Sequence, residues 1–325
     1  MTGKVHIVLA THNGAAWLPA QLDSLLGQSE RSWTLLISDD GSGDETPDII
    51  NRFAERDARI HVLESRPGMA GSALTMYAGL LAAAFDDGAD YVFCCDQDDV
   101  WAADKIERVL AALRRLEGPE REPALVHHDL TVVDERLEGT AESYWRLLDL
   151  HPGPEERPQR LLSRNEVTGC ALACNRALLE AALPVPKQAV MHDWWLALHA
   201  GFLGRLRPMP ERFVSYRQHG ANVIGAKSYR AGLNPLQNWR RTWRRGNEEF
   251  FDTVRQARAF RAAVAGGEPL AAELQRSLES YARLPELSAG ARLAALREAG
   301  VWRGNALLDG VLVLRMLLLP AEGER

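Results

Sequence analysis

Three carboxylates within four positions, those of Asp96, Asp98 and Asp99, form the group of residues best suited to chemistry in this chain. They directly follow a short, continuous apolar run at 91–95, which is typical of a fully buried strand. Adjacent carboxylates repel one another unless a cation or hydrogen-bond donors offset their charge. Hard divalent cations bind through one or two carboxylates together with substrate phosphates. The pattern favours a metal and phosphate site, and the alternative is a solvated turn in which Asp104 caps the next helix.

The elements before this site follow a strand-then-helix order. Apolar runs at 5–10, 33–38 and 60–64 precede the run at 91–95, and a helical pattern follows each of them. This order predicts an α/β fold with a parallel sheet and right-handed crossovers. The carboxyl ends of parallel strands meet at one edge of the sheet, where ligands bind. Polar side chains follow the first two strands at that edge, namely Thr11, Asn13, Asp39 and Asp40.

The second half of the chain is less regular. The expected elements are a strand from 124 that leads into 128–129, an apolar run at 167–173, a helix that ends before 184, a helix from 192 and a strand at 213–219. Residues 235–300 are expected to be helical and charged, with a break at 266–267.

The composition, with 46% hydrophobic and 25% charged residues, is that of a globular protein, so one large domain or one domain with an appendage is expected. The net charge of -6 argues against a nucleic-acid partner bound through bulk positive charge. No signal peptide and no membrane-spanning segment are expected. The four cysteines are interpreted as small buried residues in a reducing cytoplasm, and the alternative makes Cys170 and Cys174 half of a zinc site.

The two acidic clusters at one sheet edge can bind different parts of one ligand. One would bind a base or ribose, and the other would hold a metal that bridges a diphosphate, as a nucleotide-diphosphate sugar requires. The motifs resemble, in the same order, those of family 2 glycosyltransferases, and the last acidic motif is similar to the rhamnosyltransferase-like branch. Over about residues 4–225 these motifs are Ala10-Thr11-His12-Asn13-Gly14, Ser38-Asp39-Asp40-Gly41-Ser42, Asp96-Gln97-Asp98-Asp99-Val100-Trp101, Val167-Thr168-Gly169-Cys170, His192-Asp193-Trp194-Trp195 and Tyr216-Arg217-Gln218-His219-Gly220 with Asn222-Val223.

The resemblance implies a GT-A fold, a Rossmann-like and mostly parallel sheet flanked by helices, in a domain at 1–225, followed by a helical C-terminal region at 226–325. It implies an inverting, metal-dependent transfer of a sugar, with L-rhamnose from dTDP-rhamnose as the best candidate. The acceptor would be a cell-surface polysaccharide or a lipid-linked glycan precursor. The expected partners are therefore a dTDP- or UDP-sugar and a glycan acceptor, and the expected cofactor is Mg²⁺ or Mn²⁺.

The resemblance also implies roles for the residues at the sheet edge. Asp39 or Asp40 would hydrogen-bond the pyrimidine and the ribose, since a carboxylate accepts well from an imide N–H. Thr11 and Asn13 would lie nearby on the nucleotide sugar.

The second acidic motif would hold the diphosphate. Asp96 and Asp98 form a DxD pair, of which at least one contacts the metal, and Gln97 between them is expected to contact the nucleotide sugar. His219 would be a further ligand of the metal or of a phosphate. The alternative is a strand-end histidine bonded to the backbone.

Asp193 is the expected catalytic base, because inverting transfer needs a carboxylate to take the proton of the acceptor hydroxyl. The metal, not a protein acid, would stabilise the leaving nucleoside diphosphate. Trp194 and Trp195 give an apolar setting that raises the pKa of an acid, and aromatic rings such as that of Trp194 stack on sugars. The alternative is that Asp193 caps the helix, and His192 is either a helix-start residue or functional.

Two places depart from the family pattern. The loop at 66–72 carries Gly71 or Ser72 where relatives often have an asparagine near the nucleotide, and Arg66 either reaches a phosphate or is a surface residue. His128 and Asp129 either contact the donor sugar or acceptor, or form a strand-end turn.

The C-terminal region raises the question of a membrane. Residues 239–245 combine two tryptophans with four arginines, which suits an anionic membrane surface or a helix that packs its tryptophans on the core. The apolar stretch at 306–320 is too short to span and would be a buried helix, a homo-oligomer contact or an interfacial anchor. Peripheral association with the inner face of the plasma membrane is therefore expected.

Other functions fit the residues less well. A nucleotidyltransferase would need a Gly-rich, Lys- or Arg-bearing triphosphate loop after the first strand, and residues 11–14 lack one. An oxidoreductase would need G-x-G-x-x-G there. A non-catalytic sugar-nucleotide-binding scaffold could have lost any of Asp96, Asp98, Asp193 and His219, and all four are present.

Overall fold

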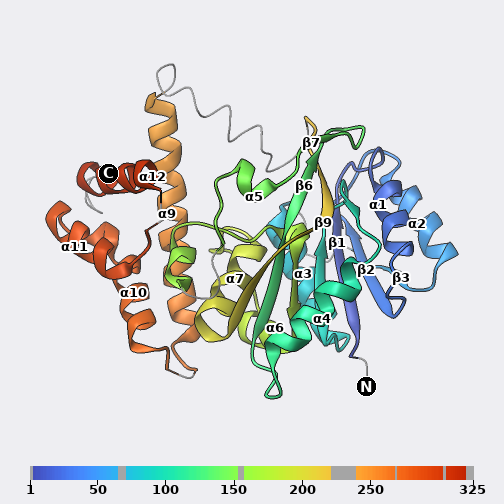
Figure 1. Ribbon diagram of the computed structural model, residues 1–325, viewed down its shortest axis with the longest axis horizontal. Coiled ribbons are helices and arrows are strands. Elements are labelled where there is room, and N and C mark those ends of the chain that lie inside the picture. Colours follow the sequence, from blue (N-terminus) through green and yellow to red (C-terminus); the bar gives the residue numbers. More distant parts are fainter. Residues whose placement is uncertain are drawn as a thin grey trace.

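The computed structural model describes residues 3–64, 71–152, 157–220, 239–267, 269–302 and 305–319. Its centre is a curved sheet with the strand order β3-β2-β1-β4-β8-β6-β9-β5, and β7 pairs with β6 (Figure 1). The strands are β1 (Val5–Thr11), β2 (Trp33–Asp39), β3 (Ile60–Val62), β4 (Tyr91–Cys95), β5 (Val100–Trp101), β6 (Ala124–Val133), β7 (Gly139–Ala141), β8 (Leu172–Asn175) and β9 (Arg205–Arg217).

Helices cover both faces of the sheet. They are α1 (Leu18–Leu26), α2 (Thr46–Arg56), α3 (Ala73–Asp86), α4 (Lys105–Glu117), α5 (Tyr144–Leu147), α6 (Arg176–Ala182), α7 (His192–Leu203), α9 (Trp239–Val264), α10 (Ala272–Ala282), α11 (Ala289–Ala299) and α12 (Ala306–Leu318). Three 3₁₀ turns are η1 (Pro158–Leu162), η2 (Gly169–Ala171) and η3 (Leu284–Glu286).

The first half of the sheet is parallel, as the strand-then-helix order predicts. β1 pairs in parallel with β2 and β4, and β2 pairs in parallel with β3. Beyond β4 the sheet is mixed, because β8 runs antiparallel to both β4 and β6. The parallel half brings the residues that follow β1, β2 and β4 to one edge, which is the condition for a shared site.

The sheet separates two hydrophobic cores, since successive side chains of a strand point to opposite faces. On one side, α1, α2 and α4 pack on the sheet, with Leu22 and Phe53 among the buried residues. On the other side, α3, α6 and α7 pack on it, and α9 to α12 extend the same core. Val8 of β1 belongs to this second core and its neighbour Leu9 to the first.

Two strands extend beyond the sequence predictions. β6 continues through His128 and Asp129, which are buried in mid-strand, so the alternative in which they form a strand-end turn is wrong. The register of β6 against β9 shifts at these two residues. β9 begins at Arg205 rather than near 213, because Pro208 and Pro210 hide its first half from a strand pattern.

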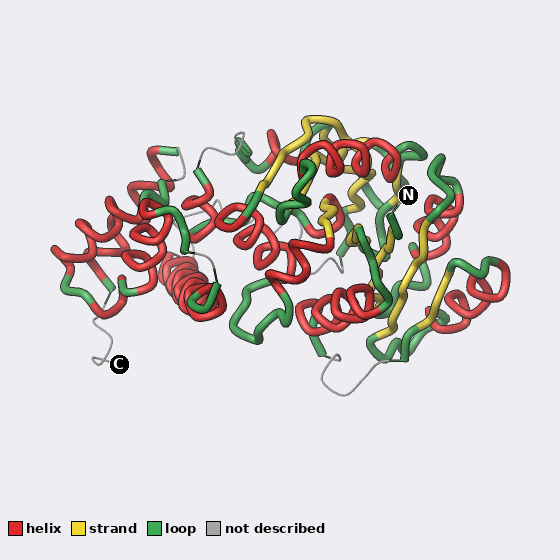
Figure 2. Tube along the Cα trace, turned by 90° about the horizontal axis from the view of Figure 1, so that it is seen from below, coloured by secondary structure: helices red, strands yellow, loops and turns green. Residues whose placement is uncertain are grey.

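The C-terminal helices lie beside α7 (Figure 1), and from below they form a region of helices without strands (Figure 2). Phe260 of α9 is fully buried and contacts Trp195 and His199 of α7 edge-on. The predicted helical character of residues 235–300 and their break near 266–267 are confirmed within the described residues. The predicted domain boundary at 225, like Arg66, Asn222 and Val223, lies outside the described residues. Over the part of the chain that is described, no helix combines the length and apolar character needed to cross a bilayer.

Candidate active site

The first two strand ends are joined by side-chain hydrogen bonds. Thr11 is buried, and its Oγ1 donates to Oδ1 of Asp39 over 2.8 Å. Ser42 donates to the same carboxylate through its Oγ, over 2.6 Å, and through its backbone N–H, over 2.8 Å. Asp39 therefore holds the turn after β2 in place, and most of its acceptor capacity is used inside the protein.

Asn13 and Asp40 fix the loops around that turn. Asn13 has a left-handed backbone (φ 48°), which asparagine tolerates, and its Oδ1 accepts from the N–H of Gly43 over 2.8 Å. Asp40 accepts from the N–H of Gly71, with distances of 3.0 and 3.1 Å to its two oxygens. Gly71 thus supplies a backbone donor beside the nucleotide-binding candidates, at the place where relatives often carry an asparagine.

Gln97 links the ends of β1 and β4. Its Oε1 accepts from the N–H of His12 over 2.9 Å, and its Nε2 donates to the carbonyl of the same residue over 3.0 Å. A Cβ on Gly14 would lie 2.2 Å from Oε1 of Gln97, so only glycine leaves room for this contact. The side chain predicted to contact the nucleotide sugar is therefore engaged in joining two loops.

Asp96 lies at the end of β4 against α3. Its Oδ1 accepts from the hydroxyl of Tyr77 over 2.8 Å, and the same hydroxyl lies 2.6 Å from the carbonyl of Cys95. Burial, followed by the negative charge of Asp98, raises the pKa of Asp96 to about 6. The carboxylate is thus held in a setting that favours a positive partner.

Asp98 faces His219, the residue two positions after β9. Nε2 of His219 lies 2.8 Å from Oδ2 of Asp98, and both side chains are largely buried. The imidazole stacks on Trp17, with ring centroids 5.2 Å apart. Arg217 supports the pair, because its Nε donates to the carbonyl of Asp98 over 2.7 Å and its guanidinium lies over Trp17.

Asp99 lies behind this pair in the interior. Its Oδ1 accepts from the backbone N–H of Arg217 over 3.0 Å, whereas its buried Oδ2 has no hydrogen-bond partner among the described residues. Ligand atoms of Asp96, Asp99 and Cys170 lie within 4.8 Å of one another. Burial, followed by the charge of Asp98, raises the pKa of Asp99. This cluster is a second place where positive charge is favoured.

Lys105 brings one such charge to the buried side of the cluster. It is fully buried at the start of α4, its Nζ donates to the carbonyl of Cys170 over 2.7 Å, and it lies 3.4 Å from the centre of the Trp101 ring. Burial lowers the pKa of Lys105 to about 8, which leaves it mostly protonated at neutral pH. The alternative for the acidic motif, a solvated turn, is wrong, because Asp99 is fully buried.

The four cysteines are free and buried, as predicted. Cys170 belongs to the core on one side of the sheet and Cys174 to the core on the other side. The alternative in which Cys170 and Cys174 form half of a zinc site is therefore wrong.

Asp193 lies in the first turn of α7 and is buried. Its Oδ1 accepts from the N–H of Trp194 over 2.6 Å and from Nδ2 of Asn165 over 3.1 Å. Burial raises the pKa of Asp193 to about 7, and the negative charge of Asp96 adds to the shift. The residue is thus coupled to the acidic edge. The alternative in which Asp193 caps the helix is wrong, because α7 begins at His192 with Met191 as its N-cap residue, and Asp193 lies inside the first turn.

The two tryptophans after Asp193 lie in the core. The indole N–H of Trp194 donates to the carbonyl of Leu161 over 2.5 Å, and that of Trp195 donates to the carbonyl of Ala182 over 2.7 Å. This orientation supports the apolar setting expected around Asp193. It does not favour the predicted stacking of Trp194 on a sugar.

His192 lies beside the site as a buried, neutral imidazole. Its ring stacks on Tyr77 with centroids 3.9 Å apart, and neither ring nitrogen has a hydrogen-bond partner among the described residues. Burial lowers its pKa to about 3. A Cβ on Gly169 would lie 3.1 Å from Nε2 of His192, so the small residue in the Val-Thr-Gly-Cys motif leaves space for the ring.

Sequence reasoning missed Tyr77, Trp17 and Asn165 as parts of this site. Tyr77 and Trp17 lie in or next to helices with an apolar pattern, where an aromatic residue is most simply interpreted as core. Asn165 precedes the Val-Thr-Gly-Cys motif by only two positions, and that closeness is the signal that could have found it.

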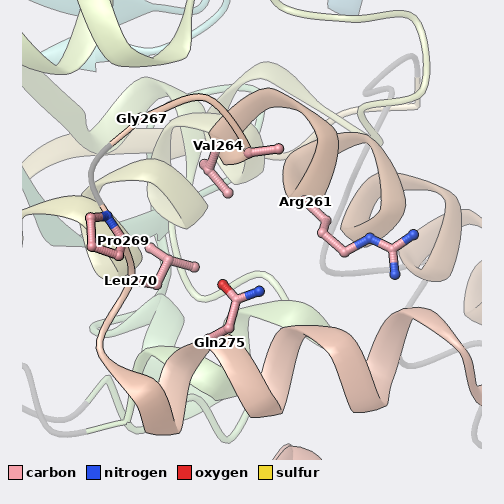
Figure 3. A pocket seen from close by; sticks show the side chains of 7 residues that line it. Arg261, Val264, Gly267, Pro269, Leu270 and Gln275 are labelled. Carbon is pink, nitrogen blue, oxygen red and sulfur yellow. The ribbon is translucent and has the colours of Figure 1, made fainter.

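A pocket of about 370 Å³ lies elsewhere, between the end of α9 and the start of α10. Figure 3 shows Gln275 and Leu270 on one side of it and Val264 on the other. The residues that line it are exposed or half-buried, and none of the predicted site residues is among them.

A mixed α/β sheet that joins a DxD pair, a histidine and a buried carboxylate at one edge defines a GT-A glycosyltransferase fold. Two solved structures share this fold. The S. aureus TarS fragment 1–349 has a TM-score of 0.52 at 14% identity, covering 92% of this chain and 91% of that one. The Pyrobaculum calidifontis mannosyltransferase PcManGT, solved with GDP-Man and Mn²⁺, has a TM-score of 0.52 at 18% identity, covering 97% and 81%.

The amino-terminal third of the chain is similar to glycosyltransferase family 2. Residues 6–118 match the family model described as Glycosyl transferase family 2. An uncharacterized glycosyltransferase of Nostoc sp. is 25% identical over 228 residues, which are 67% of this chain and 66% of that protein.

Two relatives with more specific names match shorter stretches. The dTDP-rhamnosyl transferase RfbG of Shigella flexneri is 33% identical over 106 residues, 32% of this chain and 36% of the relative. WfgD of Escherichia coli, a UDP-Glc:alpha-D-GlcNAc-diphosphoundecaprenol beta-1,3-glucosyltransferase, is 28% identical over 109 residues, 34% of this chain and 40% of the relative. The chain thus spans less than two thirds of the length of these curated relatives.

Proposed function

We propose that this protein is an inverting, metal-dependent glycosyltransferase that moves a sugar from a nucleotide-diphosphate donor to a glycan acceptor. The observation that carries the proposal is the convergence of the Asp98–His219 pair with Asp96 at the end of β4, beside the buried carboxyl of Asp193. The group formed by Asp96, Asp98 and His219 suits a cation and a diphosphate, and the carboxyl of Asp193 suits the role of general base.

The metal would be held by Asp98 and His219, with Asp96 beside them. The residues fit such an ion, because an imidazole nitrogen and a carboxylate oxygen already lie 2.8 Å apart and point at one another from different strand ends. Oxygen ligands suit both Mg²⁺ and Mn²⁺, and an imidazole tilts the choice toward Mn²⁺. When bound, the ion supplies positive charge to the leaving diphosphate.

The nucleoside would bind at the ends of β1 and β2. Asp40 is the stronger candidate for the base and ribose, because Asp39 is occupied by Thr11 and Ser42. Thr11 and Asn13 would act mainly by fixing the loops that shape this pocket. The N–H of Gly71 orients Asp40 by donating to its carboxylate.

Asp193 would take the proton of the acceptor hydroxyl. As the acceptor oxygen forms its bond to the anomeric carbon, the proton passes to a carboxylate oxygen of Asp193. The bond from the anomeric carbon to the diphosphate oxygen breaks, and its electron pair leaves with the nucleoside diphosphate. A carboxyl with a pKa of about 7 is matched to this task, because at neutral pH it is partly ionised and still basic enough to accept a proton.

The donor we propose is dTDP-rhamnose, supported by the motif form and by the name of RfbG. The acceptor we propose is a lipid-linked glycan precursor for a cell-surface polysaccharide, since WfgD is named for a diphosphoundecaprenol-linked acceptor. With such an acceptor, the enzyme would act at the inner face of the plasma membrane and would be a peripheral membrane protein there.

The test is calorimetry of dTDP-rhamnose, UDP-glucose, UDP-N-acetylglucosamine and GDP-mannose, each with Mg²⁺, with Mn²⁺ or with EDTA. We expect metal-dependent binding of dTDP-rhamnose, lost in Asp98→Ala and kept in Asp104→Ala, which removes a half-exposed carboxylate that pairs with Arg108. Binding of another donor would replace rhamnose in the proposal. Binding by the protein without turnover on any lipid-linked acceptor would favour the scaffold instead.

A further inference from the structure

The outer face of α12 is apolar along its whole length. The exposed residues of this helix are Ala306, Leu307, Gly310, Val311, Leu314, Leu317 and Leu318. Leu307 is 77% exposed and Leu318 is 61% exposed, whereas Leu312 and Met316 on the opposite side are buried in the core. A helix that is apolar on both faces is typical of burial or of contact with a bilayer, not of contact with water.

The charged residues of α12 lie at its sides. Asp309 and Arg315 are half-buried, so neither projects from the middle of the outer face. Arg315 turns toward α9, where its guanidinium lies over the ring of Trp243 and donates to the carbonyl of Gly246. The first turns of α9 therefore lie next to α12.

The first turns of α9 are basic. Arg241, Arg244 and Arg245 are exposed, and Trp243 among them is half-buried. Arg244 and Arg245 pair with Glu248 and Glu249, one turn further from the amino end of the helix. All four side chains are more than half exposed, and ion pairs of this kind are weak, so the arginines can exchange to other anions.

From these observations we infer that α12 and the first turns of α9 form a docking surface for an anionic lipid bilayer. The outer leucines would enter the boundary between headgroups and acyl chains, and the arginines beside them would contact lipid phosphates. Trp243 has the amphipathic ring that is enriched at this depth. The helix lies on the membrane, since 13 residues fall short of the roughly 20 needed to span it.

A second copy of the chain fits this surface less well. A helix of 13 residues is about 20 Å long and about 10 Å wide, so its outer face offers on the order of 200 Å². A stable dimer buries roughly 800 Å² per partner. A two-fold contact would also bring the arginine clusters of the two copies toward each other, because each copy uses the same patch.

The surface is on the appropriate side of the molecule. In Figure 1, α12 and the amino end of α9 lie at the upper side, toward which β1 and β6 run and where their carboxyl ends lie. A membrane at this surface would therefore be on the side of the acidic edge. This point rests on the proposed function, because it matters only if the acceptor is lipid-linked.

The test is flotation of the full chain with vesicles of pure phosphatidylcholine or of phosphatidylcholine with 30% phosphatidylglycerol, without donor, acceptor or metal. We expect the wild type to bind the anionic vesicles. The variant Leu314→Asp/Leu318→Asp should bind at least tenfold less, and Arg241→Gln/Arg244→Gln/Arg245→Gln should lose the preference for anionic lipid. The matched control is Leu137→Asp, an exposed leucine in a turn with positive φ on another part of the surface.

Two results would overturn the inference. One is equal vesicle binding by the wild type and the Leu314→Asp/Leu318→Asp variant, with both chains shown to be folded by their melting curves. The other is a wild-type dimer in light scattering that becomes monomeric in the same variant, which would make a second copy the occupant. Metal-dependent donor binding should be unchanged in all of these variants, so a failure here is distinct from a failure of the proposed glycosyl transfer.

Discussion

Nε2 of His219 and Oδ2 of Asp98 lie 2.8 Å apart, although the two residues are 121 positions apart in the sequence. The contact joins two segments that are distant in the sequence, since Asp98 follows β4 and His219 follows β9. Trp17 backs the imidazole and Arg217 holds the carbonyl of Asp98, so the pair has little freedom to separate. Two ligand atoms are thus preorganised at the place where a metal-bound diphosphate would sit.

The first prediction concerns this pair. Asp98→Asn should weaken Mn²⁺ binding by at least 100-fold, and His219→Ala should weaken it by 10- to 100-fold, because each removes one donor from the same site. Mn²⁺ titration in the presence of TDP or UDP, followed by calorimetry or electron spin resonance, measures both. His61→Ala removes an exposed histidine from β3 and should change nothing. Unchanged affinity in both site variants would show that the ion is held elsewhere.

The second prediction concerns the pH dependence of turnover. A base must be deprotonated to act, and Asp193 has a pKa of about 7, so kcat should rise with pH through a midpoint near 7. Asp193→Asn should lower kcat by about 10²- to 10⁴-fold and leave metal-dependent donor binding within a few-fold of the wild type. Steady-state rates from pH 5.5 to 9 provide the measurement. A variant that loses donor binding and turnover together would argue for a structural role only.

A third prediction concerns stability at the same residue. Folding raises the pKa of Asp193 from 3.8 to about 7, so the ionised carboxyl destabilises the folded chain as pH rises above 3.8, and the penalty is complete above pH 7. Asp193→Asn should therefore be more stable than the wild type at pH 8, by up to roughly 4 kcal/mol, and similar to it near pH 3.5. Urea denaturation at the two pH values measures the difference. An equal effect at both would show that the carboxyl does not titrate in this range.

A fourth prediction addresses the support of Asp96. Tyr77→Phe removes the hydroxyl that lies 2.8 Å from Oδ1 of Asp96 and keeps the ring that stacks on His192. Loss of a partner that orients a ligand should weaken Mn²⁺ binding by about 10-fold or more. The matched control is Tyr281→Phe, which loses a buried hydroxyl bonded to Thr253 in the C-terminal helices. If the two variants bind Mn²⁺ alike, Tyr77 does not orient the carboxylate.

The fifth prediction concerns Lys105, whose buried ammonium group lies behind the acidic cluster. Lys105→Met keeps the size and apolar stem but leaves Asp96 and Asp99 without this charge, so the free energy of unfolding should fall by roughly 3 kcal/mol at neutral pH. Chemical denaturation without added metal gives the value. Lys187→Met replaces an exposed lysine and should have no effect. A Lys105→Met chain as stable as the wild type would mean that hydrogen bonds alone hold the buried acids.

The sequence predicts the parallel half of the sheet and the positions of its acids, because both depend on local patterns. Buried strands such as β4 are continuous apolar runs, and the residues that end them are adjacent in sequence. The sequence also identifies Asp193 and His219 as candidates, through short motifs. Their burial could not be predicted from those motifs, because it depends on contacts with distant parts of the chain, such as Asn165 beside Asp193 and Trp17 beside His219.

The contacts that the sequence could not predict are those between distant elements. The hydroxyl of Tyr77 reaches Asp96 because α3 packs on β1, the neighbour of β4 in the sheet, and no local pattern encodes that packing. Gln97 was expected on the nucleotide sugar and instead bonds the backbone of His12, since β1 and β4 are neighbours in the sheet. Trp194 was expected on a sugar, and its indole N–H is directed at Leu161 because η1 packs on α7.

The paired hydrogen bonds of Gln97 to His12 have a consequence for which donors fit. They tie the loop proposed to bind the nucleoside to the loop that carries Asp96 and Asp98, through one planar amide. The separation between the two binding regions is then set by the protein before any ligand arrives. A donor that reaches both regions therefore meets a separation that Gln97 already holds fixed, whichever base or sugar lies at either end.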